Sequence, residues 1–266
     1  MRRAKLYHSL FAFLTLALAA CSTGSTAPVV KIGLAAPFEG RYRAIGYEAI
    51  YAARLAIREI NAAGGIGGYR VELFALDDGG DPAMAVEQAR KMAIDPQVIA
   101  VIGHYRPETT GAAIGHYCAE RLPLLAVEPV RTGVCRDAFA LTPPITTPLS
   151  SSDPASFLFV GTVPHPADAP EAAAFVEAYN AIPIDGTRAG PIALQTYDAM
   201  VLLFDALGRN IQAEGKPSQG GMARALAESD FTGLGGVYRF DAEGNRTQMK
   251  MYTYRYSKDR EPELIR

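Results

Sequence analysis

The stretch Val29-Val30-Lys31-Ile32-Gly33-Leu34-Ala35 decides the fold, because it sets a pattern that recurs along the first half of the chain. It is a short apolar run with β-branched residues, and Pro37 and Gly40 follow it. This pattern predicts a buried strand that leads into a loop. Three further apolar runs are predicted strands of the same kind: residues 71–76, 98–102 and 124–127.

Helical periodicity fills the segments between these strands. Apolar residues recur on one face of a helix that starts near Gly46 and is followed by a glycine-rich turn at 64–68. Further helices are predicted at residues 83–93 and 109–121. Four strand–helix steps with fully apolar strands indicate a parallel sheet that is covered on both faces. The predicted fold class is therefore α/β, with a doubly wound parallel sheet.

The loops that follow the strands are the candidate binding site. Right-handed crossovers bring all of these loops to the carboxyl edge of the sheet, where open α/β folds bind their ligands. The candidate loops are residues 38–46, 77–81, 104–110 and 128–133.

Composition narrows the function classes. The 266 residues are 49% hydrophobic and 20% charged, which is typical of a packed globular protein and excludes a disordered or collagen-like chain. The 26 basic and 28 acidic residues give a formal charge of −2, which is too balanced for a dedicated nucleic-acid binder. We therefore expect no nucleic-acid partner.

The first twenty residues have the pattern of an export signal. A basic start is followed by an apolar run at residues 10–20, which is too short to span a bilayer comfortably. The run ends in Leu18-Ala19-Ala20-Cys21, which resembles the lipobox of bacterial lipoproteins. That resemblance implies cleavage before Cys21, lipidation of its thiol, and a chain tethered at the bacterial cell envelope. A signal peptide with an incidental cysteine is the alternative.

Two other cysteines remain, Cys118 and Cys135. In an oxidising compartment they are candidates for a disulfide, although a count of two does not establish the geometry. A catalytic thiol is the alternative, but the sequence offers no compelling histidine partner for it.

The second half of the chain has a different composition. Residues 140–154 are rich in Thr, Ser and Pro, so no regular helix is expected there. A strand is predicted at 157–163, and helices at 170–181, 190–210 and 222–228. A closing hairpin is predicted to pair residues 236–240 with residues 248–256.

A search for catalytic and metal-binding motifs gives little. There is no Gly-x-Ser-x-Gly, Walker loop, His-Glu-x-x-His or Cys-x-x-Cys, and the histidines are dispersed without metal-ligand spacing. Asp77, Asp78 and Asp81 could suggest a calcium loop, but they lack EF-hand spacing. A capped turn with solvated carboxylates is the other interpretation. We predict no enzyme activity, no metal and no cofactor.

Several stretches carry a family resemblance in their order along the chain. They are residues 31–37, 56–66, 77–82 and 101–104, followed by 190–199 and 240–245. Together they resemble the Leu/Ile/Val-binding type I periplasmic binding proteins, the solute-binding components of ABC importers. The resemblance implies an amino acid or similar solute held in a cleft between two lobes, and an ABC permease as partner.

The resemblance also implies particular binding residues. Thr132 matches a threonine that binds the amino-acid head group, and Val130 matches a position of backbone contact. Ile45 and Ile192 match apolar positions that face the ligand side chain. The remaining contacts fall on the loop after Gly103, and the candidates there are His104, Tyr105, Arg106 and Thr109.

Two departures from the family pattern stand out. Pro107 occupies a position where the family usually has serine, and it follows Arg106, whose guanidinium could clamp a carboxylate or could be solvated. In addition, about 100 residues of the second lobe have no counterpart. The expected division is a signal peptide at 1–20, a lipidated linker at 21–28, a first lobe at 29–137 and 187–240, and a truncated second lobe at 138–186 and 241–266.

Two functions are compatible with these features. The first is a lipid-anchored solute-binding protein of an ABC importer for branched-chain or other amino acids. The second is a truncated, non-catalytic relative that acts as a protein-contact adaptor or sensor, or a degenerate paralogue without a ligand. The missing part of the second lobe motivates the second function.

Overall fold

The structure is a computed structural model that describes residues 27–129, 135–142, 157–183, 188–256 and 262–265. A five-stranded parallel sheet with the strand order β2-β1-β3-β4-β5 forms its centre. The strands are β1 (Val29–Ala36), β2 (Arg70–Asp77), β3 (Val98–Gly103), β4 (Leu124–Ala126) and β5 (Ala138–Ala140). The α/β fold class and the four expected strands are confirmed, and β5 extends the same sheet.

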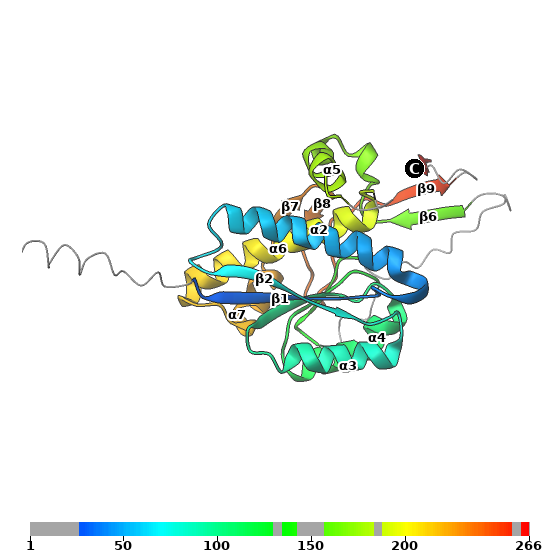
Figure 1. Ribbon diagram of the computed structural model, residues 1–266. Coiled ribbons are helices and arrows are strands. Elements are labelled where there is room, and N and C mark those ends of the chain that lie inside the picture. Colours follow the sequence, from blue (N-terminus) through cyan, green and yellow to red (C-terminus); the bar gives the residue numbers. More distant parts are fainter. Residues whose placement is uncertain (1–26, 130–134, 143–156, 184–187, 257–261, 266) are drawn as a thin grey trace, which may run out of the picture.

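Helices cover both faces of this sheet, as the apolar strands require (Figure 1). On one face lie α2 (Arg43–Ala62), α6 (Pro191–Glu214) and α7 (Gln219–Ala227), whose apolar side chains share one core with β1 and β3. On the other face lie α3 (Pro82–Ala93) and α4 (Pro107–Ala119), which form a second core with the same sheet. The short helical turn η1 (Gly40–Tyr42) precedes α2.

Local side-chain contacts explain where these helices begin and end. Asp81 caps α3, because its carboxylate accepts hydrogen bonds from the amides of Ala83 and Met84, each at 2.9 Å. Asn61, in the last turn of α2, exchanges two hydrogen bonds with the backbone of Val71, at 2.8 and 2.9 Å. The end of α2 is thereby fastened to the start of β2.

The segments outside the main sheet form two small sheets. β10 (Pro262–Leu264), β9 (Tyr252–Tyr256) and β6 (Phe157–Gly161) form an antiparallel sheet in that order, on the side of the molecule where β1 ends (Figure 1). β7 (Phe231–Gly233) and β8 (Gly236–Tyr238) form a hairpin. The turns η3 (Pro166–Asp168) and η4 (Pro170–Ala172) lead into α5 (Ala173–Asn180), which packs against α2 and α6.

The prediction of the closing hairpin is wrong. The turn at residues 241–245 does form, and the Asp241 amide donates to the Asn245 carbonyl at 3.0 Å. However, β8 pairs with β7, while β9 pairs with β6 and β10. After the turn, Phe240 and Arg246 form one antiparallel bridge, and the Thr247 amide donates to the Arg239 carbonyl at 2.9 Å, but the described residues show no longer ladder there. Residues 252–256 pair with β6 and β10 instead, because an alternating strand does not specify its partner.

Cys118 and Cys135 are joined in a disulfide, which confirms the first of the two alternatives for them. The bond links the last turn of α4 to the residues that precede β5. It closes a loop of the chain that contains β4. Of the residues that the structure describes, none lies in a helix that is both long enough and apolar enough to cross a membrane.

Candidate functional site

The loops after β1, β2, β3 and β4 meet at the carboxyl edge of the main sheet, as expected for parallel strands. Hydrogen bonds join the loops after β1, β2 and β3 to one another. The Asp77 carboxylate, at the end of β2, accepts from the amide of Phe38 after β1 at 2.7 Å and from the amide of Gly79 at 2.9 Å. The aspartates of this loop thus act as caps of turns and of α3.

A buried His–Asp pair anchors the loop after β3. His104 and Asp78 are both fully buried, and His104 Nδ1 lies 2.6 Å from Asp78 Oδ2. The other ring nitrogen, Nε2, lies 3.1 Å from the hydroxyl of Tyr117 on α4. Both ring nitrogens of His104 thus have partners within the protein, and the side chain is buried. We therefore infer that His104 positions the loop that it begins.

Tyr105 fastens the same loop to the opposite face of the sheet. Its side chain is buried, and its hydroxyl lies 2.8 Å from the hydroxyl of Thr196 on α6. Burial raises the pKa of Tyr105 far above its ordinary value, so this hydroxyl stays protonated. Tyr105 is therefore a second positioning residue of the loop.

Arg106 is the residue of this loop that carries a charge to the edge of the sheet. Its guanidinium lies over the ring of Tyr42, 3.9 Å from the centroid, and one nitrogen lies 3.2 Å from the Glu108 carboxylate. Its Nε is buried and has no hydrogen-bond partner among the described residues. Gly80 permits this stack, since a Cβ at its position would lie 2.6 Å from the Tyr42 ring.

Glu128 brings an acidic group to the same place. It follows β4, and burial raises its pKa to about 7. The positive charge of Arg106 opposes this shift, whereas the carboxylate of Glu108 adds to it. The edge thus combines a cation, an aromatic ring and a carboxyl group that titrates near neutrality.

The other predicted site residues have different positions. Thr109 is fully buried and donates to the Arg106 carbonyl at 3.0 Å, so its hydroxyl braces the loop. Ile45 on α2 and Ile192 on α6 are partly buried and pack against the core that those two helices share. Val130, Thr132 and the lipidation candidate Cys21 lie outside the described residues.

Glu48 joins α2 to the start of α6 beside Ile192. Its carboxylate accepts a hydrogen bond from the Ala193 amide at 2.9 Å, in the first turn of α6. Burial raises the pKa of Glu48 to about 7, although hydrogen bonds from the backbone of α6 oppose the shift. This group was not singled out from the sequence, where it reads as a polar position on an amphipathic helix.

Glu48 gives an expected pH dependence of stability. Its pKa lies above the ordinary value of 4.5, so the unfolded chain loses this proton first as the pH rises. The contribution of Glu48 is complete below about pH 4.5 and is lost as the pH rises through about 7. We expect Glu48→Gln to match the unmodified chain near pH 4 and to exceed its free energy of unfolding near pH 8 by about 1–3 kcal/mol.

Urea unfolding at both pH values tests this expectation. Glu177→Gln, which changes an exposed carboxylate on α5, is the matched control and should track the unmodified chain at both pH values. A constant difference between Glu48→Gln and the unmodified chain across this range would contradict the assignment.

The described residues offer no cluster of metal ligands. No three His, Cys, Asp or Glu side chains in the described ranges are grouped so that they could hold a metal ion. The arrangement is instead one of positioned charges, an aromatic ring and backbone groups around a sheet edge, which suits the binding of a small polar solute.

Comparison with known proteins relates this chain to binding proteins. Residues 29–148 match the model of the periplasmic binding protein family. This match covers the main sheet and most of the helices that follow its strands, and it ends before β6. The family is one of binding proteins rather than of enzymes.

Curated relatives match the same part of the chain. An amino acid binding protein of Pseudomonas aeruginosa is 35% identical over 111 residues, which are 42% of this chain and 29% of that protein. The Leu/Ile/Val-binding protein BraC3 of Rhizobium johnstonii is 40% identical over 85 residues, which are 32% of this chain and 22% of that protein. The matched stretch thus spans less than a third of these relatives.

Solved structures share the fold over most of the chain. The branched-chain amino acid transporter substrate-binding protein LivJ of Streptococcus pneumoniae, in complex with isoleucine, has a TM-score of 0.71 at 17% identity. That match covers 89% of this chain and 99% of LivJ. A solute-binding protein of R. palustris in complex with benzoate has a TM-score of 0.68 at 14% identity, covering 89% of this chain and 95% of that protein. Type I periplasmic binding proteins therefore share the fold of this chain.

Proposed function

We propose that this chain is the solute-binding lipoprotein of an ABC importer and that it binds an amino acid at the carboxyl edge of the main sheet. The observation that carries the proposal is Arg106, which is stacked on Tyr42 with a buried Nε that has no partner among the described residues. A planar guanidinium matches a carboxylate with two parallel hydrogen bonds. Arg106 is thus suited to the carboxylate of the solute.

Glu128 suits the other charge of an amino acid. Its carboxyl group lies within the electrostatic influence of Arg106, and its pKa of about 7 means that an approaching ammonium group would favour its ionised form. A neighbouring cation and carboxylate complement a zwitterion, whereas a simple anion or cation would satisfy only one of them. The relatives named for amino acids and the isoleucine-bound neighbour support this choice.

The location and the partners belong to the same proposal. Export, lipidation at Cys21 and an ABC permease as partner are supported by the signal-like first twenty residues and by the importer components that share the fold. We also propose the division into a first lobe at 29–137 and 187–240 and a reduced second lobe at 138–186 and 241–266, except that β5 (Ala138–Ala140) belongs to the main sheet and thus to the first lobe. Replacement of Cys21 by alanine should release the chain from the membrane fraction of the cells that express it.

Calorimetric titration with a panel of amino acids tests the binding site. We expect one or more of them to bind in the micromolar range, and Arg106→Gln to weaken that binding by at least about tenfold. Arg90→Gln, which removes an exposed arginine of α3, is the control for the loss of one positive charge and should bind normally. Flat titrations across the panel, or equal affinity in the Arg106 variant, would contradict the proposal.

A second candidate function is a protein-contact adaptor or sensor. The observation that favours it is that three large apolar side chains on and beside β9 and β10 are exposed, namely Met251, Leu264 and Ile265. Exposed apolar surface often marks protein contacts. This function would replace the first if the amino-acid titrations are flat and the chain co-purifies with a partner that Leu264→Glu releases.

A further inference from the structure

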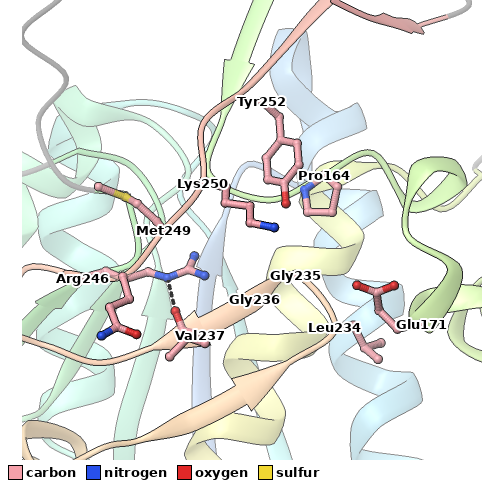
Figure 2. Close-up of a pocket in the computed structure, with 11 residues that line it drawn as sticks. Pro164, Glu171, Leu234, Gly235, Gly236, Val237, Arg246, Met249, Lys250 and Tyr252 are labelled. Carbon is pink, nitrogen blue, oxygen red and sulfur yellow. Dashed lines mark hydrogen bonds between the residues drawn. The ribbon is translucent and has the colours of Figure 1, made fainter. Parts of the chain in front are cut away.

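A cavity lies apart from the loops at the carboxyl edge. Its volume is about 430 Å³, and it is lined by the β7–β8 hairpin, the segment between Arg246 and Tyr252, and the residues Pro164 and Glu171 (Figure 2). None of the described residues of the loops after β1 to β4 lines it. It is therefore separate from the site that the proposed function uses.

Arg246 forms the floor of this cavity. Its side chain is only 2% exposed, and its guanidinium lies over the Tyr238 ring, 3.8 Å from the centroid. Nε donates to the Val237 carbonyl at 2.7 Å, but Nη1 is buried and has no hydrogen-bond partner in the described part of the chain. A buried donor without a partner is costly, so this guanidinium retains capacity for one more acceptor.

The carboxylate of Asp198 does not supply that acceptor. It is buried on α6, and its oxygens already accept from the amides of Leu234 and Gly235, at 2.9 and 2.6 Å, and from the Tyr238 hydroxyl at 2.9 Å. Across the described ranges, no carboxylate forms an ion pair with Arg246. Asp198 offsets the buried charge at longer range.

Other side chains converge on the same space. Figure 2 shows the Lys250 ammonium and the Tyr252 hydroxyl pointing into the cavity on the same side as the Arg246 guanidinium. Leu234, Val237 and Met249 supply apolar wall. Glu171 also lines the cavity, and its acidic group disfavours a multiply charged anion.

We propose that this cavity binds a small organic carboxylate, with its anionic group held between Arg246 and Lys250 and its carbon skeleton against the apolar wall. The planar guanidinium and the ammonium group both favour a carboxylate, and the apolar residues favour a hydrocarbon chain over a bare inorganic ion. The site is independent of the proposed amino-acid site, because it shares no residue with it.

Titration of the full chain with 4-methylpentanoate, followed by amide NMR, tests the proposal. We expect saturable shifts of the Gly235 and Gly236 amides. Isopentylamine, which has a similar skeleton but no carboxylate, should give none, and inorganic phosphate should bind more weakly. Absence of saturable shifts with 4-methylpentanoate, or equal shifts with isopentylamine or tighter binding of phosphate, would overturn the proposal.

Variants locate the binding. Lys250→Glu changes an exposed residue and should weaken binding of 4-methylpentanoate by at least about tenfold without affecting folding. Lys216→Glu makes the same charge change in the exposed loop after α6 and should have no effect. Arg246→Lys, which keeps the charge but loses the planar fork, should also weaken binding.

Arg106→Gln separates this site from the amino-acid site. It should leave the response of the Gly235 and Gly236 amides unchanged, even if the amino-acid titrations fail. Loss of that response in Arg106→Gln, or its retention in Lys250→Glu, would overturn the proposal.

Discussion

Replacement of Asp78 by alanine is expected to lower the free energy of unfolding by about 3–5 kcal/mol, because it leaves one member of a buried pair without its partner. Asp78 and His104 are both fully buried and lie 2.6 Å apart. Asp78 also accepts a hydrogen bond from the Gly80 amide at 2.8 Å. Urea denaturation, with a fixed pH and with the disulfide intact, measures the loss.

The same substitution should also affect the candidate amino-acid site. His104 begins the loop that carries Arg106, so loss of its anchor should weaken solute binding even under conditions where the chain stays folded. Asp205→Ala, which removes one member of an exposed pair with Arg209, is the matched control and should change stability little. A similar, small effect of the two substitutions would show that the pair does not anchor the loop.

Four strands of the main sheet could be predicted because their predicted ranges are apolar runs, interrupted only by Lys31 in β1 and Glu72 in β2. Residues 98–102, for example, are apolar throughout, and a run of this length is typical of a buried strand. β5 has only three residues and was not predicted. The antiparallel sheet of β10, β9 and β6 could not be predicted in the same way. Residues 252–256 alternate as a strand should, but alternation does not identify the partner strand, and here the partner is about a hundred residues away in sequence.

The candidate site could be predicted as a set of loops but not as a set of contacts. Topology brings the loops after β1, β2 and β3 together, as predicted, and the binding of a solute there stays a prediction. The role of each side chain depends on burial, which a single sequence does not show. His104 reads as a possible ligand contact, yet its burial against Asp78 and Tyr117 makes it a positioning residue.

Other residues were missed for the same reason. Glu128 belongs to a predicted loop, and an acidic residue directly after a buried strand was the available signal. Arg246 gave no signal at all, because a single arginine after a turn is usually solvated. Only the packing of the β7–β8 hairpin reveals its burial.

Asp198→Ala is expected to have an effect of similar size to that of Asp78→Ala, about 3–5 kcal/mol, through a different mechanism. Two opposing effects decide whether Asp198→Ala lowers or raises the free energy of unfolding. Burial raises the pKa of Asp198, so its carboxylate carries a desolvation cost that alanine removes. Alanine also leaves three donors without an acceptor: the amides of Leu234 and Gly235 and the Tyr238 hydroxyl.

The second effect should dominate. Each unsatisfied buried donor costs about 1–3 kcal/mol, and the buried guanidinium of Arg246 would lose its opposing charge as well. The turn is shaped around this carboxylate, since a Cβ at Gly233 would lie 2.6 Å from it. We therefore expect the β7–β8 hairpin to detach from α6, with faster hydrogen exchange at the Leu234 and Gly235 amides.

Asp230→Ala is the matched control, because Asp230 flanks the same hairpin but forms an exposed pair with Arg239. It should leave both stability and hydrogen exchange nearly unchanged. Asp198→Asn should lower the free energy of unfolding by an amount between those of Asp198→Ala and Asp230→Ala. The amide of asparagine keeps one oxygen acceptor, but its NH₂ group faces a donor that the carboxylate had accepted from. If Asp198→Ala were as mild as Asp230→Ala, the hairpin would be held by its apolar contacts alone, and Arg246 would need no opposing carboxylate to remain buried.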